Sequence, residues 1–139
     1  MRGEPVYPVI VFSNNDNMIY VYFNERKLKS TSEALLKKID YKKLELFDAS
    51  GHQYKITEAF KVKFLGLWGF NPILKGRQIL IDFKYDPVIE DISFEDFKRN
   101  IVIRLENNKR FWESGWDIEE LKQKIYETTT FIEIAELLK

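Results

Sequence analysis

Two segments in which apolar residues alternate with polar ones constrain the fold more than any other feature of this sequence. Within residues 54–64, the large apolar side chains share one parity, with Glu58 as the exception: Tyr54, Ile56, Phe60, Val62 and Phe64. The same alternation returns in the second segment at Ile79, Ile81, Phe83 and Tyr85. A period of two is typical of a β-strand with one buried face. We therefore predict two long, half-buried strands, the first of them bulged or broken near Glu58 and Ala59.

The connection between these two strands is too apolar for an ordinary solvated loop. Residues 65–75 hold a run of large apolar side chains that is interrupted by Gly66 and Gly69. The spacing of the glycines matches neither the dinucleotide-binding motif nor the P-loop, so a phosphate-binding loop is excluded. We expect this segment either to be buried or to meet a partner, and Trp68 and Phe70 are its candidate anchors.

A β-hairpin is predicted near the N-terminus. Two apolar runs, Val6–Phe12 and Met18–Phe23, flank the polar segment Ser13–Asn17, which is rich in Asn and Asp. These two residue types tolerate positive φ and bond their own backbone, so they favour a tight turn. Both runs are apolar at nearly every position, which predicts cover on both faces of the sheet. Pro8 cannot donate to a strand ladder, so we expect the first strand to lie at an edge or to start near this residue.

Four capping signatures predict four helices. Each places Ser, Thr or Asp three residues before an acidic residue: Ser30–Glu33, Ser93–Asp96, Asp117–Glu120 and Thr130–Glu133. The first helix, for which Ser30 is the expected N-cap, is short and ends near Asp40. Residues 101–103 are also compatible with a strand, but the capping residues and the helical spacing of the apolar positions favour a helix.

These patterns together predict an α+β fold in a single domain that spans residues 1–139. We expect about five strands, since residues 44–46 add another alternating segment, and a mainly antiparallel sheet because the links are short. One short helix from the N-terminal half and about three helices from the C-terminal third would pack on this sheet.

The composition excludes several classes of protein. With 11 Phe, 7 Tyr and 3 Trp in 139 residues, the chain has enough aromatic side chains for a real core and is not intrinsically disordered. The absence of cysteine excludes disulfides and thiolate metal sites, and a single histidine excludes a histidine cluster. No window approaches the length of an apolar membrane span, and no signal peptide is evident. We therefore expect a cytoplasmic protein that does not enter membranes and has neither metal nor cofactor.

No catalytic residue is predicted. His52, the single histidine, would need an orienting carboxylate, and Asp48 is near enough in sequence to be one. A polar residue beside a turn is the interpretation that we prefer. The carboxylates at positions 90, 91, 95 and 96 are typical of a helix N-terminus, where the macrodipole favours acidic residues. An enzyme is thus not expected, and a minor hydrolase built on His52 is kept only as a third alternative.

A second concentration of aromatic residues lies at Phe111–Trp116. Trp112 and Trp116 flank an expected helix break at Gly115. Tryptophans of this kind either fill gaps between helices and a sheet, which we place first, or anchor a protein interface. In the second case Glu113 and Asp117 would provide charge complementarity. The predicted partner-binding residues are therefore Trp68, Phe70, Trp112, Glu113, Trp116 and Asp117.

The order of several segments resembles that of a known group of proteins. These segments are Tyr7–Val11, Ile19–Tyr22, Lys43–Gly51, Phe64–Gly69, Asp117–Leu121 and Phe131–Ile134. In this order they are similar to small bacterial immunity-type proteins, which are encoded beside secreted polymorphic toxins. The resemblance implies a cytoplasmic protein that binds and blocks a cognate toxin without chemistry of its own.

The expected function is therefore protein binding, with a cognate toxin as partner. The alternative is a nucleic-acid-binding module, since residues 1–85 carry 14 Lys and Arg against 9 Asp and Glu. Basic residues also alternate there with aromatic ones, at Tyr20, Tyr22, Arg26, Lys27 and Lys29. We do not expect nucleic acid as a partner, because the basic residues form no uninterrupted stripe.

Overall fold

A computed structural model describes residues 4–64, 78–86 and 90–139. Within these residues the chain forms seven strands, six α-helices and one short 3-10 helix, which confirms the predicted α+β class. The strands are β1 (Val9–Ser13), β2 (Ile19–Tyr22), β3 (Ser30–Ser32), β4 (Leu44–Phe47), β5 (His52–Phe64), β6 (Gln78–Tyr85) and β7 (Glu90–Asp91). The helices are α1 (Glu25–Leu28), α2 (Glu33–Lys38), the 3-10 helix η1 (Tyr41–Lys43), α3 (Phe94–Asn107), α4 (Lys109–Trp112), α5 (Ile118–Glu127) and α6 (Phe131–Leu138).

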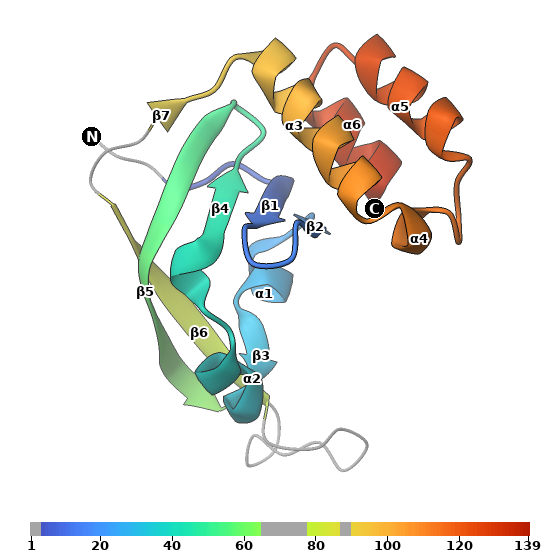
Figure 1. The fold of residues 1–139 in the computed structure, drawn as a ribbon. Coiled ribbons are helices and arrows are strands. Elements are labelled where there is room, and N and C mark those ends of the chain that lie inside the picture. Colours follow the sequence, from blue (N-terminus) through green and yellow to red (C-terminus); the bar gives the residue numbers. More distant parts are fainter. Residues whose placement is uncertain (1–3, 65–77, 87–89) are drawn as a thin grey trace.

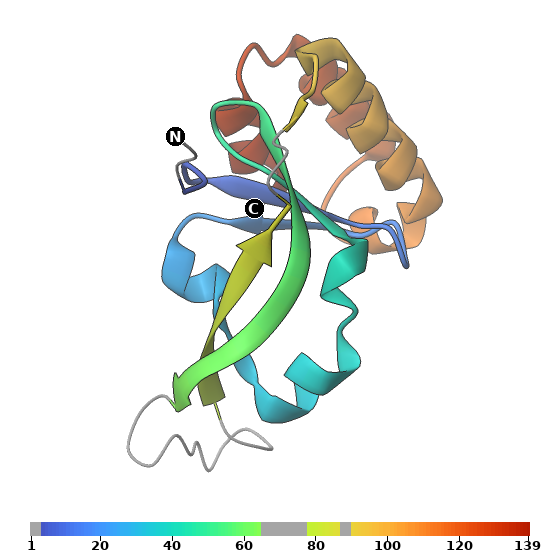
Figure 2. The same cartoon turned by 90° about the vertical axis from the view of Figure 1, so that its left-hand side faces the viewer.

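The strands form one antiparallel sheet in the order β2-β1-β4-β5-β6-β3, and β7 pairs with the start of β5. The long strand β5 curves through the molecule, so that its first part lies beside β4 and its second part beside β6 (Figures 1 and 2). The sheet has more strands than the five predicted, and the described chain has more helices than predicted, since α1, η1 and α4 were not anticipated. The two strands that were not anticipated, β3 and β7, span three and two residues. Elements this short show no measurable periodicity.

Strand β1 lies inside the sheet and supplies two separate cores. Its even-numbered residues Ile10 and Phe12 belong to a cluster with the C-terminal helices. Its odd-numbered residues Val9 and Val11 belong to a second cluster on the concave side of the curled sheet. Cover on both faces was predicted for both runs and is confirmed for β1, whereas Tyr20 of β2 is 40% exposed. The expectation of an edge position is wrong, since β1 pairs with both β2 and β4, but the strand does start directly after Pro8.

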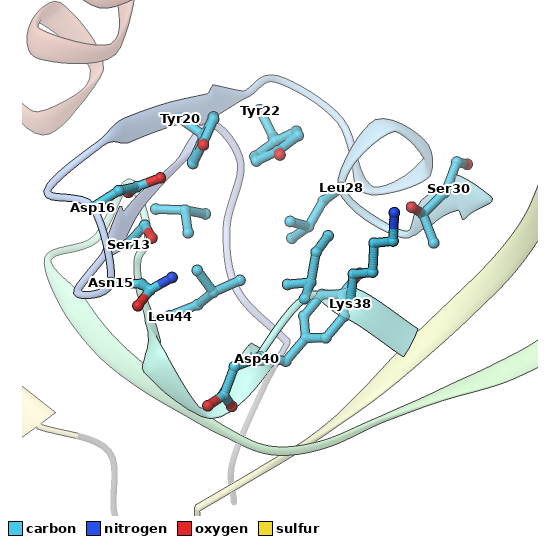
Figure 3. Close-up of a pocket in the computed structure, with 14 residues that line it drawn as sticks. Ser13, Asn15, Asp16, Tyr20, Tyr22, Leu28, Ser30, Lys38, Asp40 and Leu44 are labelled. Carbon is cyan, nitrogen blue, oxygen red and sulfur yellow. The ribbon is translucent and has the colours of Figure 1, made fainter. Parts of the chain in front are cut away.

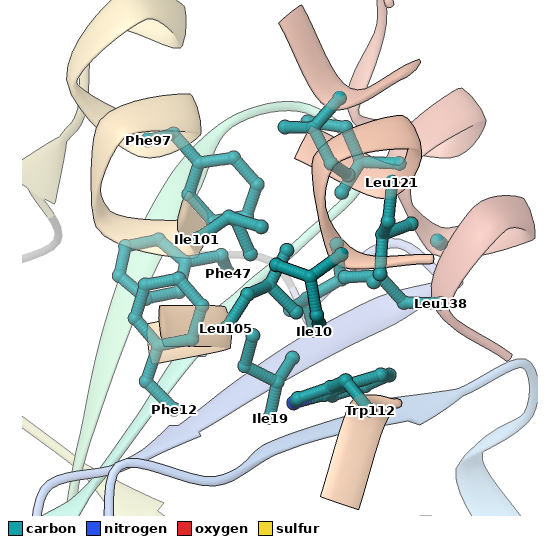
Figure 4. Close-up of a cluster of buried hydrophobic side chains, with 14 residues drawn as sticks. Ile10, Phe12, Ile19, Phe47, Phe97, Ile101, Leu105, Trp112, Leu121 and Leu138 are labelled. Carbon is teal, nitrogen blue, oxygen red and sulfur yellow. The ribbon is translucent and has the colours of Figure 1, made fainter. Parts of the chain in front are cut away.

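The helices α3 to α6 cover one face of the sheet, as Figure 1 shows. Phe97 of α3 joins the two layers, with its ring centroid 5.4 Å from that of Phe12 and 5.0 Å from that of Phe47 (Figure 4). The predicted N-caps Ser93, Asp117 and Thr130 are confirmed, because each side chain accepts a hydrogen bond from a backbone N–H of the first turn. Residues 101–103 lie in α3, as the spacing predicted.

The N-cap predicted at Ser30 is wrong. Ser30 pairs with Leu80 as part of β3, and Ser32 caps α2 instead. Ser32 is followed three residues later by Leu35 and not by an acidic residue, so the capping signature pointed to Ser30, and the pairing of Ser30 with β6 excludes it. Tertiary pairing of this kind overrides a local preference.

The predicted parity of β5 holds only for its first half. Tyr54 and Ile56 are buried, whereas Phe60 and Val62 are 36% and 50% exposed. The register against β6 shifts between Ile56 and Glu58, close to the predicted bulge. An extra residue in one strand turns the side chains that follow it to the other face, so Ala59 packs against the concave core in place of its neighbours. A second shift of the register lies between Lys61 and Lys63.

Candidate functional site

The outer side of β2 is a sheet edge that no strand among the described residues occupies. In the described part of the chain, β2 pairs with β1 alone, in a register that places Val11 opposite Tyr20. The Ser13 N–H donates to the Met18 carbonyl at 3.0 Å and closes the hairpin. Ser13 and Met18 thus form a hydrogen-bonded pair, and such pairs recur at every second position of an antiparallel ladder. The next two pairs are Val11 with Tyr20 and Val9 with Tyr22, so the backbone groups of Tyr20 and Tyr22 bond to β1. The N–H and C=O groups of Ile19 and Val21 consequently point away from β1, toward the open edge.

A groove lies on the helical side of this edge, and we call it the aromatic groove. Its volume is about 390 Å³, and its lining residues are Ile19, Tyr20, Val21, Phe111, Trp112, Ser114, Gly115, Trp116, Leu138 and Lys139. Phe111 and Tyr20 are 56% and 40% exposed. Trp112 is only 7% exposed and forms part of the core beneath them. The groove therefore combines exposed aromatic surface with a fixed floor.

A second hollow, which we call the tyrosine pocket, lies on the concave side of the same edge (Figure 3). Its volume is about 370 Å³, and its lining residues are Val11, Ser13, Asn15, Asp16, Tyr20, Tyr22, Leu28, Ser30, Thr31, Lys38, Ile39, Asp40, Tyr41 and Leu44. Strands β2 and β3, which stand at the two ends of the strand order, both contribute to it. The pocket thus occupies the opening of the curled sheet.

The tyrosines of this pocket are poor acids. Burial raises the pKa of Tyr20, Tyr22 and Tyr41 above the ordinary value of 10.0, and for Tyr20 the nearby carboxylate of Asp16 raises it further. A phenol with a raised pKa stays protonated near neutral pH. These side chains are therefore suited to hydrogen bonding and ring contacts rather than to proton transfer.

The position of the hairpin relative to the helices is fixed by two side chains near the C-terminal end of α3. The guanidinium of Arg104 donates to the Ser13 carbonyl at 3.0 Å and to Asn14 Oδ1 at 2.5 Å, and lies 4.3 Å from the Phe12 ring centroid. Asn108 Nδ2 donates to the Asp16 carbonyl at 3.1 Å. Because Asn108 directly precedes α4, these bonds hold β2 and the α4 side of the aromatic groove together.

The structure brings some of the predicted partner-binding residues together. Trp112 and Trp116 both line the aromatic groove, and the burial of Trp112 agrees with the gap-filling role that was placed first. Glu113 is exposed next to them and lies 3.9 Å from the Lys109 ammonium. The carboxylate of Asp117 caps α5 by accepting from the Glu120 N–H at 3.0 Å.

The other two predicted anchors, Trp68 and Phe70, lie outside the described residues. The prediction did not include the exposed groove residues Tyr20 and Phe111. Phe111 precedes Trp112 directly, so the aromatic run itself could have indicated it. The edge position of β2 has no signal in the sequence, because it depends on which strands pair.

The structure assigns Asp48 a structural role rather than that of an orienting group for His52. The buried carboxylate accepts hydrogen bonds from the backbone N–H groups of Val6, Ser50 and His52, each at 3.0 Å. His52 Nδ1 instead lies 2.5 Å from the exposed carboxylate of Asp91, which belongs to β7 and not to a helix N-terminus. Among the described residues, no group of three or more His, Cys, Asp or Glu side chains is arranged to hold a metal ion.

One of the basic residues considered for nucleic-acid binding is already engaged within the fold. The Lys29 ammonium is buried and donates to Glu25 at 2.7 Å and to Asp82 at 2.9 Å. Burial alone would lower the pKa of Lys29, but these hydrogen bonds outweigh it and raise the pKa. Lys29 therefore stabilises the contact of α1 with β6, and its charge does not face a phosphate backbone.

Comparison of the chain with protein-family models, with curated proteins and with solved structures found no significant match. Within the parts of the chain that the structure describes, no helix has the length and apolar character needed to span a membrane.

Proposed function

We propose that this protein has no chemistry of its own and acts by binding another protein at the aromatic groove beside β2. The observation that carries this proposal is the aromatic surface of the exposed Phe111 and the half-buried Trp116, which lines a hollow of about 390 Å³ beside Tyr20. Exposed aromatic side chains that line a hollow are typical of the few residues that contribute most of the binding energy at protein interfaces.

Rigidity supports this role for the groove. Its floor, Trp112, is packed among core residues, and one wall is tied to the hairpin by Arg104 and Asn108. A surface that is fixed before binding loses less conformational entropy when a partner arrives. The groove is therefore suited to tight binding with little rearrangement.

We propose further that the partner is a cognate bacterial toxin and that this protein is its immunity protein. The support is the resemblance of the sequence to immunity-type proteins, and the mechanism would be occlusion of the toxin. Trp112 and Trp116 would act from the groove, with the charges of Glu113 and Asp117 at its rim. Trp68 and Phe70 remain proposed anchors on a separate segment.

The test uses the protein encoded by the gene next to that of this chain, purified and titrated against the full chain in a calorimeter. Phe111→Ala and Trp116→Ala should each weaken binding at least tenfold, because each removes a large aromatic contact. Tyr126→Ala is the matched control, since Tyr126 is also 50% exposed but lies on α5 and does not line the groove. Thermal unfolding of each variant checks that the fold is intact.

Two results would contradict the proposal. If the neighbouring gene product is not a toxin or does not bind, the immunity role is wrong. If it binds and all three variants bind equally well, the aromatic groove is not the contact surface.

A further inference from the structure

We propose that the partner contributes an extended segment, which joins the sheet as a new strand beside β2. Its side chains would enter the aromatic groove and the tyrosine pocket alternately. This inference rests on the proposed function, because it specifies how a protein partner engages the same site.

The backbone of β2 offers the hydrogen bonds that such a strand needs. Ile19 and Val21 are two residues apart and both direct N–H and C=O groups outward, which is the spacing at which an antiparallel partner exchanges pairs of bonds. No other strand among the described residues uses these groups. Edge strands are commonly protected from pairing by charged residues, proline or a bulge. Strand β2 reads Ile-Tyr-Val-Tyr and carries none of these three protections, although its length of four residues limits how long a pairing it can form.

The two hollows lie where the side chains of an added strand would go. Successive residues of a strand point to opposite faces of the sheet. Tyr20 lines both hollows, which places the aromatic groove and the tyrosine pocket on either side of the same edge. Backbone bonds would then provide affinity, and the two hollows would select alternate side chains.

An extended segment fits this site better than a helix does. A helix satisfies its own backbone groups internally, so it would leave the edge groups of Ile19 and Val21 unused. A helix lying in the groove would also fill the hollow on one face of the sheet only. The open edge and the pair of hollows therefore point to the same occupant.

A second copy of this chain fits less well. Two β2 strands paired antiparallel about a two-fold axis would bring both helical layers to the same side of the joined sheet. The segment Phe111–Trp116 of each copy would then compete for the space above the junction, where paired strands lie only about 4.8 Å apart. A dimer formed through β2 is accordingly an outcome that the experiment must be able to detect.

The experiment begins with a displayed library of random eight-residue peptides selected against the immobilised full chain. The tightest peptides are synthesised, and each backbone amide in turn is replaced by an ester, which removes one N–H donor. We expect the loss of affinity to alternate along the peptide: esters at every second position should weaken binding about tenfold, and esters at the positions between them should change it less than about twofold. Hydrogen exchange at the Ile19 and Val21 amides, fast in the free protein, should slow at least tenfold on binding.

A protein variant tests the same edge from the other side. Val21→Pro removes the outward N–H donor without removing a bond to β1, and should weaken peptide binding at least tenfold. Val21→Thr is the matched control, since it keeps the donor and the branched shape. Thermal unfolding of both variants monitors the fold, and the ester series remains decisive if the proline variant does not fold.

Strand addition is overturned if no peptide is selected, if ester effects lack period two, or if β2 instead pairs with a second copy in sedimentation experiments. Its failure is distinguishable from that of the proposed function. A toxin that loses affinity for Trp116→Ala but not for Val21→Pro would leave the groove as the interface and refute the added strand. Peptides that bind with period two while the neighbouring gene product does not bind would support the edge site and refute the immunity role.

Discussion

Arg104 fastens the β1–β2 hairpin to α3, and its replacement by Met should destabilise the protein substantially. The guanidinium makes two hydrogen bonds and lies against the Phe12 ring. Bonds from a charged donor contribute about 1.5–3 kcal/mol each, and the ring contact adds about 0.5–2 kcal/mol. Part of this is offset, because burial disfavours the charged form and lowers the pKa of Arg104. Met keeps the apolar packing of the side chain, so we expect a net loss of about 2–3 kcal/mol.

The assay is urea unfolding at pH 7, followed by tryptophan fluorescence and by far-ultraviolet circular dichroism. An unchanged m-value would show that the variant and the original protein unfold to the same extent. Arg99→Met provides the matched control on the same helix. Arg99 is exposed and pairs with Asp96 at the helix surface, so its loss should cost less than about 1 kcal/mol.

A loss below about 1 kcal/mol for Arg104→Met, or a loss equal to that of Arg99→Met, would refute this reasoning. In that case the hydrogen bonds of Arg104 would be no stronger than those to water, and packing alone would hold the hairpin against the helices. A large loss in stability together with weaker peptide binding at a temperature where the variant is folded would show that this contact also sets the groove geometry.

Three further predictions concern other parts of the fold. Burial would raise the pKa of Asp82, but the hydrogen bond with Lys29 outweighs it and lowers this pKa below its ordinary value of 3.8. The stability that Asp82 adds is therefore present above pH 3.8, where Asp82 is ionised in the unfolded chain, and is lost as the pH falls through the folded pKa. The difference in unfolding free energy between the original protein and Asp82→Asn should thus be constant from pH 7 to 5 and shrink in acid; a constant difference down to pH 2 would contradict the pairing. Gly51→Ala should lower stability by about 1–2 kcal/mol in urea unfolding, because φ is +86° and a Cβ would lie 3.0 Å from the Phe131 ring, whereas no loss would show that the turn relaxes. Tyr85→Phe should raise the melting temperature, since the buried Tyr85 hydroxyl has no hydrogen-bond partner among the described residues; a lower melting temperature would reveal a partner for it.

The sequence was most informative where the determining interactions are local. The N-caps at Ser93, Asp117 and Thr130 depend on a side chain and a backbone N–H three residues away, and all three are present in the structure. The strand at Ile79–Tyr85 depends on an alternation that no bulge interrupts. Such features are visible in a short window of sequence.

The candidate site could be predicted only in part. The aromatic run at Phe111–Trp116 marked one wall of the groove, since tryptophans are rare and conspicuous. The opposite wall comes from β2, about ninety residues earlier in the chain. Neither segment has a sequence pattern that predicts their contact, because the two walls are held together by hydrogen bonds from Arg104 and Asn108 to the hairpin.

The sequence by itself determined the α+β class, three of the four C-terminal helices among the described residues and the long strands, because turn, cap and period are properties of neighbouring residues. Tertiary structure alone decided which strand is an edge, which face Phe60 and Val62 occupy, and whether Ser30 caps a helix or pairs in a sheet. Each of these depends on pairing between distant segments. The free edge of β2 and the hollows beside it, on which the proposed binding mode rests, belong to this second group.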